Sequence, residues 1–235
     1  MHRRLIPFGC AAAIASGVAV TASLGIAGEP FDGAVAALLA RPVRSPSVGS
    51  AGAWEPVAAK NGLVVVARPI EGSKIREVRA FGPVDYPAER LMAVLADLDR
   101  FPEIMPPTVE THALERRGAT TLWHIVIDPP VVSKRDYCAF VTISRRADGV
   151  LHSTWKQTDE GCPPPAKGVI RMRHTEGRWE LTPLDGNRTY VDYLGFSDPG
   201  GSIPAWAVNR AAAGSMTDMF RSLVKAAADS RYASR

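Results

Sequence analysis

Residues 132–137 read VSKRDY, residues 167–171 read KGVIR, and residues 198–204 read DPGGSIP. In the first segment, a valine-led turn leads through Arg135 and Asp136 into a strand with an aromatic residue at its start. The second segment is a β-branched strand after a glycine, and the third is a glycine-rich turn that ends in proline. Proline suits the first turn of a helix, so the third segment predicts that a helix begins there. The order strand, strand, helix decides the fold.

The residues after Pro204 predict one amphipathic helix of about 25 residues. One stripe of this helix is apolar and is expected to face inward. Its members are Trp206, Ala213, Met216, Met219, Phe220, Leu223 and Ala227.

Short β-rich runs separated by turns precede this helix and predict an antiparallel meander. Leucines at helical spacing after Pro87 predict one further helix, which ends at the prolines from Pro102 onward. A long amphipathic helix after such a meander covers the concave face of a curved sheet. The sequence therefore predicts an α+β helix-grip fold, in which a curved antiparallel sheet wraps around the C-terminal helix. The strands are expected at 62–67, 75–81, 109–114, 121–127, 137–144, 151–157, 169–174, 178–183 and 189–196.

The three segments quoted first, taken in their order, resemble the START (StAR-related lipid transfer) domains, which share the Bet v 1-like helix-grip fold. The resemblance covers residues 52–230. It implies an internal apolar tunnel between the sheet and the C-terminal helix, in which a lipid is bound. It points away from catalysis.

Candidate walls of this tunnel are the apolar faces of the middle strands and the stripe of the last helix. Composition alone favours a solid core at these positions, and only the resemblance favours a tunnel. The candidate ligand-binding residues are Leu122, His124, Val126, Ala139, Val141, Ile143, Trp155, Met172, Met216, Met219 and Phe220.

Arg135, Asp136 and Arg171 are the polar candidates for contact with a lipid head group. Charges at the start of a strand usually pair locally, and this structural interpretation is favoured for the first two. Some START members have a charged pair inside the cavity, but its arginine position is Val141 here, and no acid stands near His124 on the preceding strand. This departure favours a neutral or weakly polar ligand, with His124 either as its polar contact or as a hydrogen-bonded core histidine.

Two glycine-containing segments are candidate gates, because glycine offers hinges and proline stiffens the chain between them. One is the loop 158–168 near the expected tunnel mouth, and the other precedes the last helix. The gate residues are Gly161, Pro164, Gly168, Gly200 and Gly201.

These features predict a protein that binds a sterol, a fatty acyl lipid or a phospholipid and carries or senses it without chemistry. The rival hypothesis is a polyketide cyclase/aromatase-like enzyme on the same scaffold, but its cavity would need several polar groups where the predicted inward faces are mostly aliphatic. Motifs for a catalytic nucleophile, a metal site or a phosphate loop are absent from the sequence. We therefore expect no enzyme activity, no cofactor and no metal. We also expect transient membrane contact and a monomer.

The 235 residues carry a formal net charge of +4, and the basic residues are scattered along the sequence. A scattered, mild positive charge is not the footprint of a nucleic-acid-binding protein. The sequence is therefore not expected to bind nucleic acid.

Residues 1–27 begin with a basic segment, continue uncharged, and end with small residues, which indicates a signal peptide. We expect a flexible linker at 28–51, a tail at 231–235, and export to the periplasm or the outside. Retention of the first segment as a membrane anchor stays open. Export would place Cys138 and Cys162 in an oxidising compartment, where a disulfide and two free thiols are both possible.

Overall fold

The computed structural model of the chain describes residues 52–130 and 132–233. The predicted signal peptide at 1–27 and the linker at 28–51 lie outside the described residues, as does the side chain of Ala213. The fold extends two residues beyond the predicted end at 230, because the buried Tyr232 donates a hydrogen bond to Asp97 at 2.8 Å.

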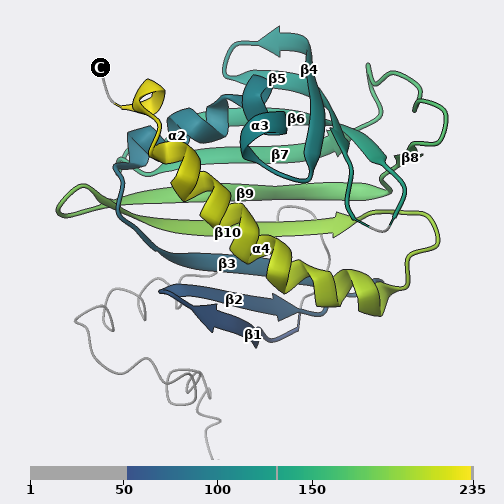
Figure 1. Ribbon diagram of the computed structural model, residues 1–235, viewed down its shortest axis with the longest axis horizontal. Coiled ribbons are helices and arrows are strands. Elements are labelled where there is room, and N and C mark those ends of the chain that lie inside the picture. The colour runs from purple at the N-terminus through teal and green to yellow at the C-terminus, as the bar shows by residue number, and fades with distance from the viewer. Residues whose placement is uncertain (1–51, 131, 234–235) are drawn as a thin grey trace, which may run out of the picture. The chain divides into compact units, whose positions relative to one another are not determined.

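One ten-stranded sheet forms the body of the fold (Figure 1). Its strands lie in the order β1-β2-β3-β10-β9-β7-β6-β5-β4, and β8 lies off this path as a parallel partner of β6. All other neighbours are antiparallel, as the predicted meander requires. The strands are β1 (Glu55–Lys60), β2 (Leu63–Arg68), β3 (Glu77–Val84), β4 (Thr108–Arg117), β5 (Thr120–Ile127), β6 (Arg135–Arg145), β7 (Leu151–Thr158), β8 (Ile170–Arg171), β9 (His174–Leu184) and β10 (Arg188–Asp198).

The meander differs from its prediction at two places. β1 was not predicted, because EPVAAK lacks a clear β pattern and becomes a strand by pairing with β2 at the sheet edge. The expected strand 169–174 is reduced to β8, and β9 runs unbroken through Gly177, which lies between the strands expected at 169–174 and 178–183. Gly177 stays in the ladder because Trp155 of β7 pairs with it on one side and Gly195 of β10 on the other.

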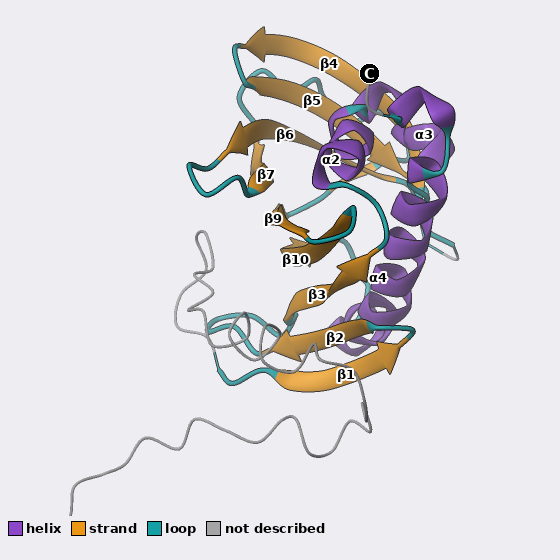
Figure 2. Ribbon diagram, turned by 90° about the vertical axis from the view of Figure 1, so that its left-hand side faces the viewer, coloured by secondary structure: helices purple, strands orange, loops and turns teal. Residues whose placement is uncertain are grey.

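The helices lie on one side of the sheet, and the sheet curves around α2 and α4 (Figure 2). α2 begins directly after Pro87 and α4 directly after Pro204, so both predicted helix starts are confirmed. The helix-grip architecture is therefore confirmed. Among the described residues, none of the helices combines the length and the hydropathy of a membrane span. The helical elements are α2 (Ala88–Ala96), η1 (Leu98–Arg100), α3 (Phe101–Ile104), α4 (Ala205–Ala227) and η2 (Ser230–Tyr232).

The main hydrophobic core lies between α2, the C-terminal part of α4 and the strands that these helices cover. Leu91 and Leu95 of α2 pack with Leu181 of β9, Val191 of β10 and Leu223 of α4, and all five are buried. Burying a leucine or valine of this kind stabilises the fold by about 1.5–3 kcal/mol. This end of the sheet is therefore filled by side chains.

Candidate functional site

The N-terminal part of α4 covers the sheet without burying its own side chains. In the segment 205–219, none of the described side chains is buried, whereas Phe220, Leu223, Ala226 and Ala227 all are. Met216 and Met219 are half-buried against the edge of the core. The helix therefore packs tightly at one end only.

The inner face of the sheet includes three small residues on its central strands. Ala139 of β6 pairs with Gln157 of β7, and Gly177 of β9 pairs with Gly195 of β10. A Cβ at Gly177 would lie 2.4 Å from Cζ2 of Trp155, and a Cβ at Gly195 would lie 2.3 Å from the Tyr193 hydroxyl oxygen. Glycine at both positions lets these two aromatic side chains lie flat over the strands.

A row of aromatic rings separates the filled end from the sparsely filled end. Trp155 stacks on Tyr193 with 5.5 Å between ring centroids, and Tyr193 meets Trp179 edge-on at 4.9 Å. Trp179 in turn lies 5.5 Å from Phe220 of α4. Aromatic pairs at such distances add about 0.5–1.5 kcal/mol to simple burial. The row therefore forms a firm boundary between the two ends.

The inner surface beyond this row is apolar with a few polar groups, of which Gln157 Oε1 is buried without a hydrogen-bond partner. The Trp155 indole N–H donates to the Thr175 hydroxyl at 3.2 Å, and Thr175 and Ser197 share a hydrogen bond at 2.9 Å. Tyr137 is only half-buried, yet burial raises its pKa to about 12. Tyr137 packs against the cluster of Leu98, Trp123, Ile125 and Val141, which accounts for this burial.

A pocket of about 760 Å³ opens at this end of the fold, between the β5–β6 connection and the start of α4. Ile170 of β8 lies on its wall as well. The other lining residues are Asp128, Pro129, Pro130, Val132, Ser133, Arg135, Ser202, Ile203, Pro204 and Ala207. The pocket is of the size that proteins use to hold a small molecule or part of a larger one.

Arg135 belongs to this pocket and is 2% exposed. One guanidinium nitrogen, Nη1, donates to the backbone oxygen of Ser133. Its Nε is buried without a hydrogen-bond partner, and none of the ion pairs among the described residues includes Arg135. This buried cation is therefore incompletely satisfied by the protein.

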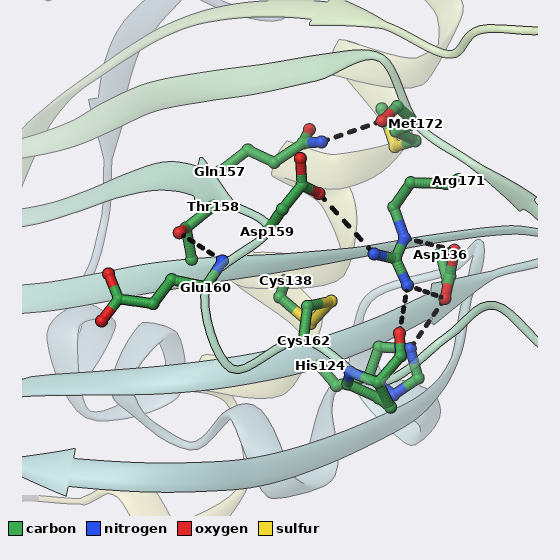
Figure 3. A network of polar contacts seen from close by, with 11 residues as sticks. His124, Asp136, Cys138, Gln157, Thr158, Asp159, Glu160, Cys162, Arg171 and Met172 are labelled. Atoms are coloured by element: carbon green, nitrogen blue, oxygen red, sulfur yellow. Dashed lines mark hydrogen bonds and ion pairs between the residues drawn. A yellow bond between two sulfur atoms is a disulfide. The ribbon is translucent and has the colours of Figure 1, made fainter.

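The next residue, Asp136, points to the opposite face of β6 and is fully engaged there (Figure 3). Its carboxylate accepts two hydrogen bonds from Arg171, at 2.9 and 3.0 Å, and lies 3.0 Å from His124 Nε2. Burial alone would raise the pKa of Asp136, but the hydrogen bonds and charges of Arg171 and His124 hold it below its ordinary value. Arg171 also donates to the backbone oxygen of Pro163 at 2.6 Å, so the network fastens the loop 158–168 to the sheet.

Comparison with known proteins agrees with this geometry. The family model described as "START domain" matches residues 47–231. The chain belongs to the START domain family.

Two curated relatives are each 29% identical to this START domain. One is an uncharacterized protein of Pseudomonas aeruginosa, over 66% of this chain and 77% of that protein. The other is the phosphatidylcholine transfer protein of Bos taurus, over 75% of this chain and 85% of that protein.

Among solved structures, a STAR-related lipid transfer protein of Xanthomonas axonopodis is similar, with a TM-score of 0.69 and 25% identity. The match covers 75% of this chain and 99% of that one. Human StAR-related lipid transfer protein 5 matches with a TM-score of 0.71, 19% identity and coverage of 84% and 95%, which supports the fold alone.

The structure places most of the expected wall residues of the START domain on the inner face. Trp123 and Ile125 pack with Leu98 of η1 on the helix side of the sheet, and they pair with Ala139 and Tyr137 of β6. The inner positions are therefore Ala139, Val141, Ile143, Trp155, Met216, Met219 and Phe220, although Val141 and Phe220 are already packed in core clusters. Met172 is buried next to β8. Contact of any of these residues with a ligand stays a prediction.

Leu122, His124 and Val126 were assigned to the wrong face. Alternation predicts correctly that they share a face, but Trp123 and Ile125 occupy the helix side, so these three residues lie on the outer side. His124 contacts Asp136 there and stacks on His112 of β4 at 6.2 Å. Asp136 and Arg171 pair with each other on the outer face, which leaves Arg135 as the inward-facing member of the three polar candidates.

The loop 158–168 is not the gate that was expected. Cys162 forms a disulfide with Cys138 of β6, with 5.7 Å between their Cα atoms, and a Cβ at Gly161 would lie 3.1 Å from Leu122. The loop, including Pro164 and Gly168, is therefore tied to the outer face by Arg171 and the disulfide. A disulfide of this span contributes roughly 3 kcal/mol to stability.

The other expected gate lies at the pocket. A Cβ at Gly200 would approach the Arg171 backbone oxygen at 3.2 Å, and one at Gly201 would lie 3.3 Å from Ile170. Both glycines have positive φ, at 65° and 68°, which a side chain would strain. Their role as a hinge stays a prediction.

Sequence reasoning missed the β5–β6 connection as the other wall of the pocket. It interpreted 132–137 as a turn that leads into a strand, although Pro129 and Pro130 make the connection too long and too stiff for a tight hairpin turn. That pair of prolines was the signal for a separate structural element at the pocket.

Proposed function

We propose that this START domain binds one lipid between the inner face of its sheet and the N-terminal part of α4, and that it carries or senses this lipid without a chemical step. The observation that carries the proposal is the absence of buried side chains among the described residues of 205–219. Protein interiors are normally packed to crystal-like density. A helix segment that buries none of its described side chains against the sheet therefore leaves room for a ligand.

The energetics of such a site suit exchange with a membrane. Each buried methylene is worth about 0.8 kcal/mol relative to water, so a chain of about 16 carbons gains on the order of 10 kcal/mol. A bilayer offers nearly the same gain. The protein can therefore hold a lipid against water and return it to a membrane at little net free energy.

The names of two similar proteins support a lipid as the ligand. One is named a phosphatidylcholine transfer protein, and the similar Xanthomonas structure is named a STAR-related lipid transfer protein. Family membership supports lipid binding in general, and the choice among sterol, acyl lipid and phospholipid is left to experiment.

Trp206 supports a membrane contact at the pocket. It lies in the first turn of α4 and is 70% exposed, contrary to its predicted place in the inward stripe. Its neighbours Ile203 and Pro204 line the pocket. Tryptophan prefers the interface between membrane and water, so the proposed docking end of the protein is the end at which the lipid would leave.

The disulfide between Cys138 and Cys162 supports the proposal of export. Disulfides persist in the periplasm and outside the cell and are rare in the reducing cytoplasm. Fractionation of cells, followed by thiol labelling of the two cysteines, tests this. Labelling of both thiols in freshly lysed cells would contradict export.

The function is tested by native mass spectrometry of the full-length gene product, purified as its own host processes it. The expected result is a discrete extra mass that extracts into organic solvent and fragments as a lipid. The same protein, stripped and incubated with vesicles of host lipids, should take up one lipid per chain. A protein that stays empty in both arms would contradict the proposal and make an assay for polyketide cyclisation the next step.

A further inference from the structure

The pocket at the start of α4 contains two independent features that attract an anion. We propose that it binds the anionic head group of the lipid, a carboxylate or a phosphate, through the Arg135 guanidinium and the N-terminus of α4. This inference rests on the proposed function, and it replaces the neutral ligand that the sequence favoured with a charged one.

Arg135 is the first feature. An arginine that is 2% exposed is expected to be paired, because an uncompensated buried charge costs several kcal/mol. Within the described residues, its one hydrogen bond goes to the Ser133 backbone oxygen, and its Nε has no partner. Asp136, its neighbour in sequence, is on the other face and belongs to Arg171. The Arg135 cation is thus buried, and the acid nearest to it in sequence, Asp136, lies on the opposite face of the sheet.

The N-terminus of α4 is the second feature. The first hydrogen bonds within this 23-residue helix run from Ala207 and Val208 to the Pro204 backbone oxygen, so the N–H groups of Ala205 and Trp206 are outside the helix ladder. The N-cap residue Pro204 supplies no side-chain cap, and the first turn holds no acidic residue. The positive end of the helix dipole is therefore unopposed on a wall of the same pocket.

The remaining charges around the pocket do not cancel these features. Asp128 is the carboxylate on the pocket wall, but it is about half exposed at the rim and lies 4.0 Å from the Lys134 ammonium. This pair leaves the rim close to neutral. Among the described residues that line the pocket, Arg135 is the charged residue that is buried.

The shape of the pocket fits an ionised head group with an acyl chain attached. Gly201 carries no side chain, and a Cβ there would lie 3.7 Å from Arg135 Nη2. Glycine therefore keeps one side of the guanidinium free of side-chain contact. Guanidinium nitrogens bind carboxylate and phosphate oxygens in pairs, with stronger hydrogen bonds than neutral partners form. Ile170, Ile203 and Ala207 supply the apolar wall along which the chain would run toward the inner face.

The inference is tested with ligands that share one chain and differ only in the head group: hexadecanoic acid, hexadecyl phosphate and hexadecan-1-ol. Dissociation constants are measured for the full-length protein by competition against a fluorescent acyl probe. The acid and the phosphate should bind at least 10-fold more tightly than the alcohol. Inorganic phosphate alone should not compete at the concentrations at which hexadecyl phosphate does.

Substitutions at Ala207 test the site without removing a buried residue. Ala207→Glu places a carboxylate in the pocket at a helix position where acids are stabilising, so the variant should fold. It should abolish the preference for the acid and the phosphate over the alcohol. Ala207→Gln introduces a side chain of equal size without the charge. It should weaken the binding of all three ligands alike and keep the ratio of their dissociation constants. Ala211→Glu places the same charge one turn later on an exposed position and should keep the wild-type preference. Arg135→Gln should lose the preference as Ala207→Glu does.

The outcomes separate this inference from the proposed function. Equal binding of acid and alcohol by the wild-type protein would overturn the anion site and leave lipid binding intact. Failure to bind any of the three ligands would overturn the anion site for an acyl lipid, and, together with a protein that stays empty in the native mass spectra, it would overturn lipid binding itself. If inorganic phosphate competes as strongly as hexadecyl phosphate, the pocket is a site for a free anion. This result would overturn the assignment of the pocket to a lipid head group.

Discussion

The two halves of α4 meet the same sheet in different ways. From Phe220 onward, α4 places Leu223, Ala226 and Ala227 into a core that it shares with α2 and the strands β2, β3, β7, β9 and β10. From Ala205 to Met219, the side chains that the structure describes are half-buried or exposed. The helix is continuous, so the difference comes from what it faces and not from its own conformation.

The contrast shows that the two ends of the fold are stabilised from different sides. At the filled end, apolar packing between sheet and helices is the main contribution. At the open end, the strands are held from the outer face, where Asp136, Arg171, His124 and the disulfide fasten the loop 158–168 to β5 and β6. A fold built in this way can leave its interior empty at one end and remain rigid there.

The largest expected effect is on the filled half of α4. Leu223→Ala should destabilise the protein by about 3 kcal/mol, because it removes a fully buried side chain and leaves a cavity. Met216→Ala, the matched change on the open half, should cost about 1 kcal/mol or less, because Met216 is only half-buried. Urea denaturation of both variants measures the difference. Equal losses would mean that the two halves are packed alike.

The next effect is on the outer network. Asp136→Asn should cost about 2 kcal/mol at pH 7, because it removes a buried carboxylate that Arg171 and His124 contact. The lowered pKa of Asp136 means that its charge stabilises the fold above its ordinary pKa of about 3.9 and that this contribution is lost as the pH falls through its lower folded value. Stability curves of wild type and variant should therefore run parallel from pH 7 to about 5 and converge below about pH 4.

Asp159→Asn is the control for this experiment. Asp159 lies 3.7 Å from the same arginine but is 84% exposed. Its loss should change stability by less than about 0.5 kcal/mol at any pH. A gap between wild type and Asp136→Asn that persists at pH 2 would contradict an electrostatic role of the carboxylate.

A smaller effect on stability, with a large one on binding, is expected for Met216→Trp. The indole would occupy the space under the open half of α4, so lipid uptake from vesicles should be lost while the free energy of unfolding changes by about 1 kcal/mol or less. Ser215→Trp, on the neighbouring exposed position, should bind lipid normally. Normal lipid uptake by Met216→Trp, counted by native mass spectrometry, would place the ligand elsewhere.

The smallest effect on stability is expected for Trp206→Ala, because the side chain is 70% exposed. Its loss should slow lipid transfer between vesicles several-fold without changing the lipid affinity. Val224→Ala removes an exposed apolar side chain from the filled half of the same helix and should leave the transfer rate unchanged. Equal transfer rates for the two variants would contradict a membrane contact at the open end.

Much of the fold could be predicted because alternation and proline placement are local signals. Pro87 and Pro204 mark the helix starts, and alternation correctly grouped Ala139, Val141 and Ile143 on one side of β6. In β5, alternation of apolar residues does not show which face lies against the helices, because Leu122 and Trp123 are both apolar and both buried. The loop over the outer face makes that side a second interior.

The candidate site was less predictable than the fold, because it depends on long-range contacts. Trp206 fits the helical stripe by spacing, yet its side chain is exposed. Arg135 and Asp136 are neighbours in a strand, so alternation correctly turns their side chains to opposite faces. The sequence does not show which face is inward, or that Asp136 pairs with Arg171, 35 residues later.

The most direct test of the open half is photo-crosslinking with hexadecanoic acid that carries a diazirine in mid-chain, followed by peptide mapping. A lipid held under the open half should label peptides from 205–219 of α4 and from the inner positions of β6 and β7 around Ala139 and Trp155. Labelling confined to 220–227, or to the outer-face residues around His124, would contradict the account.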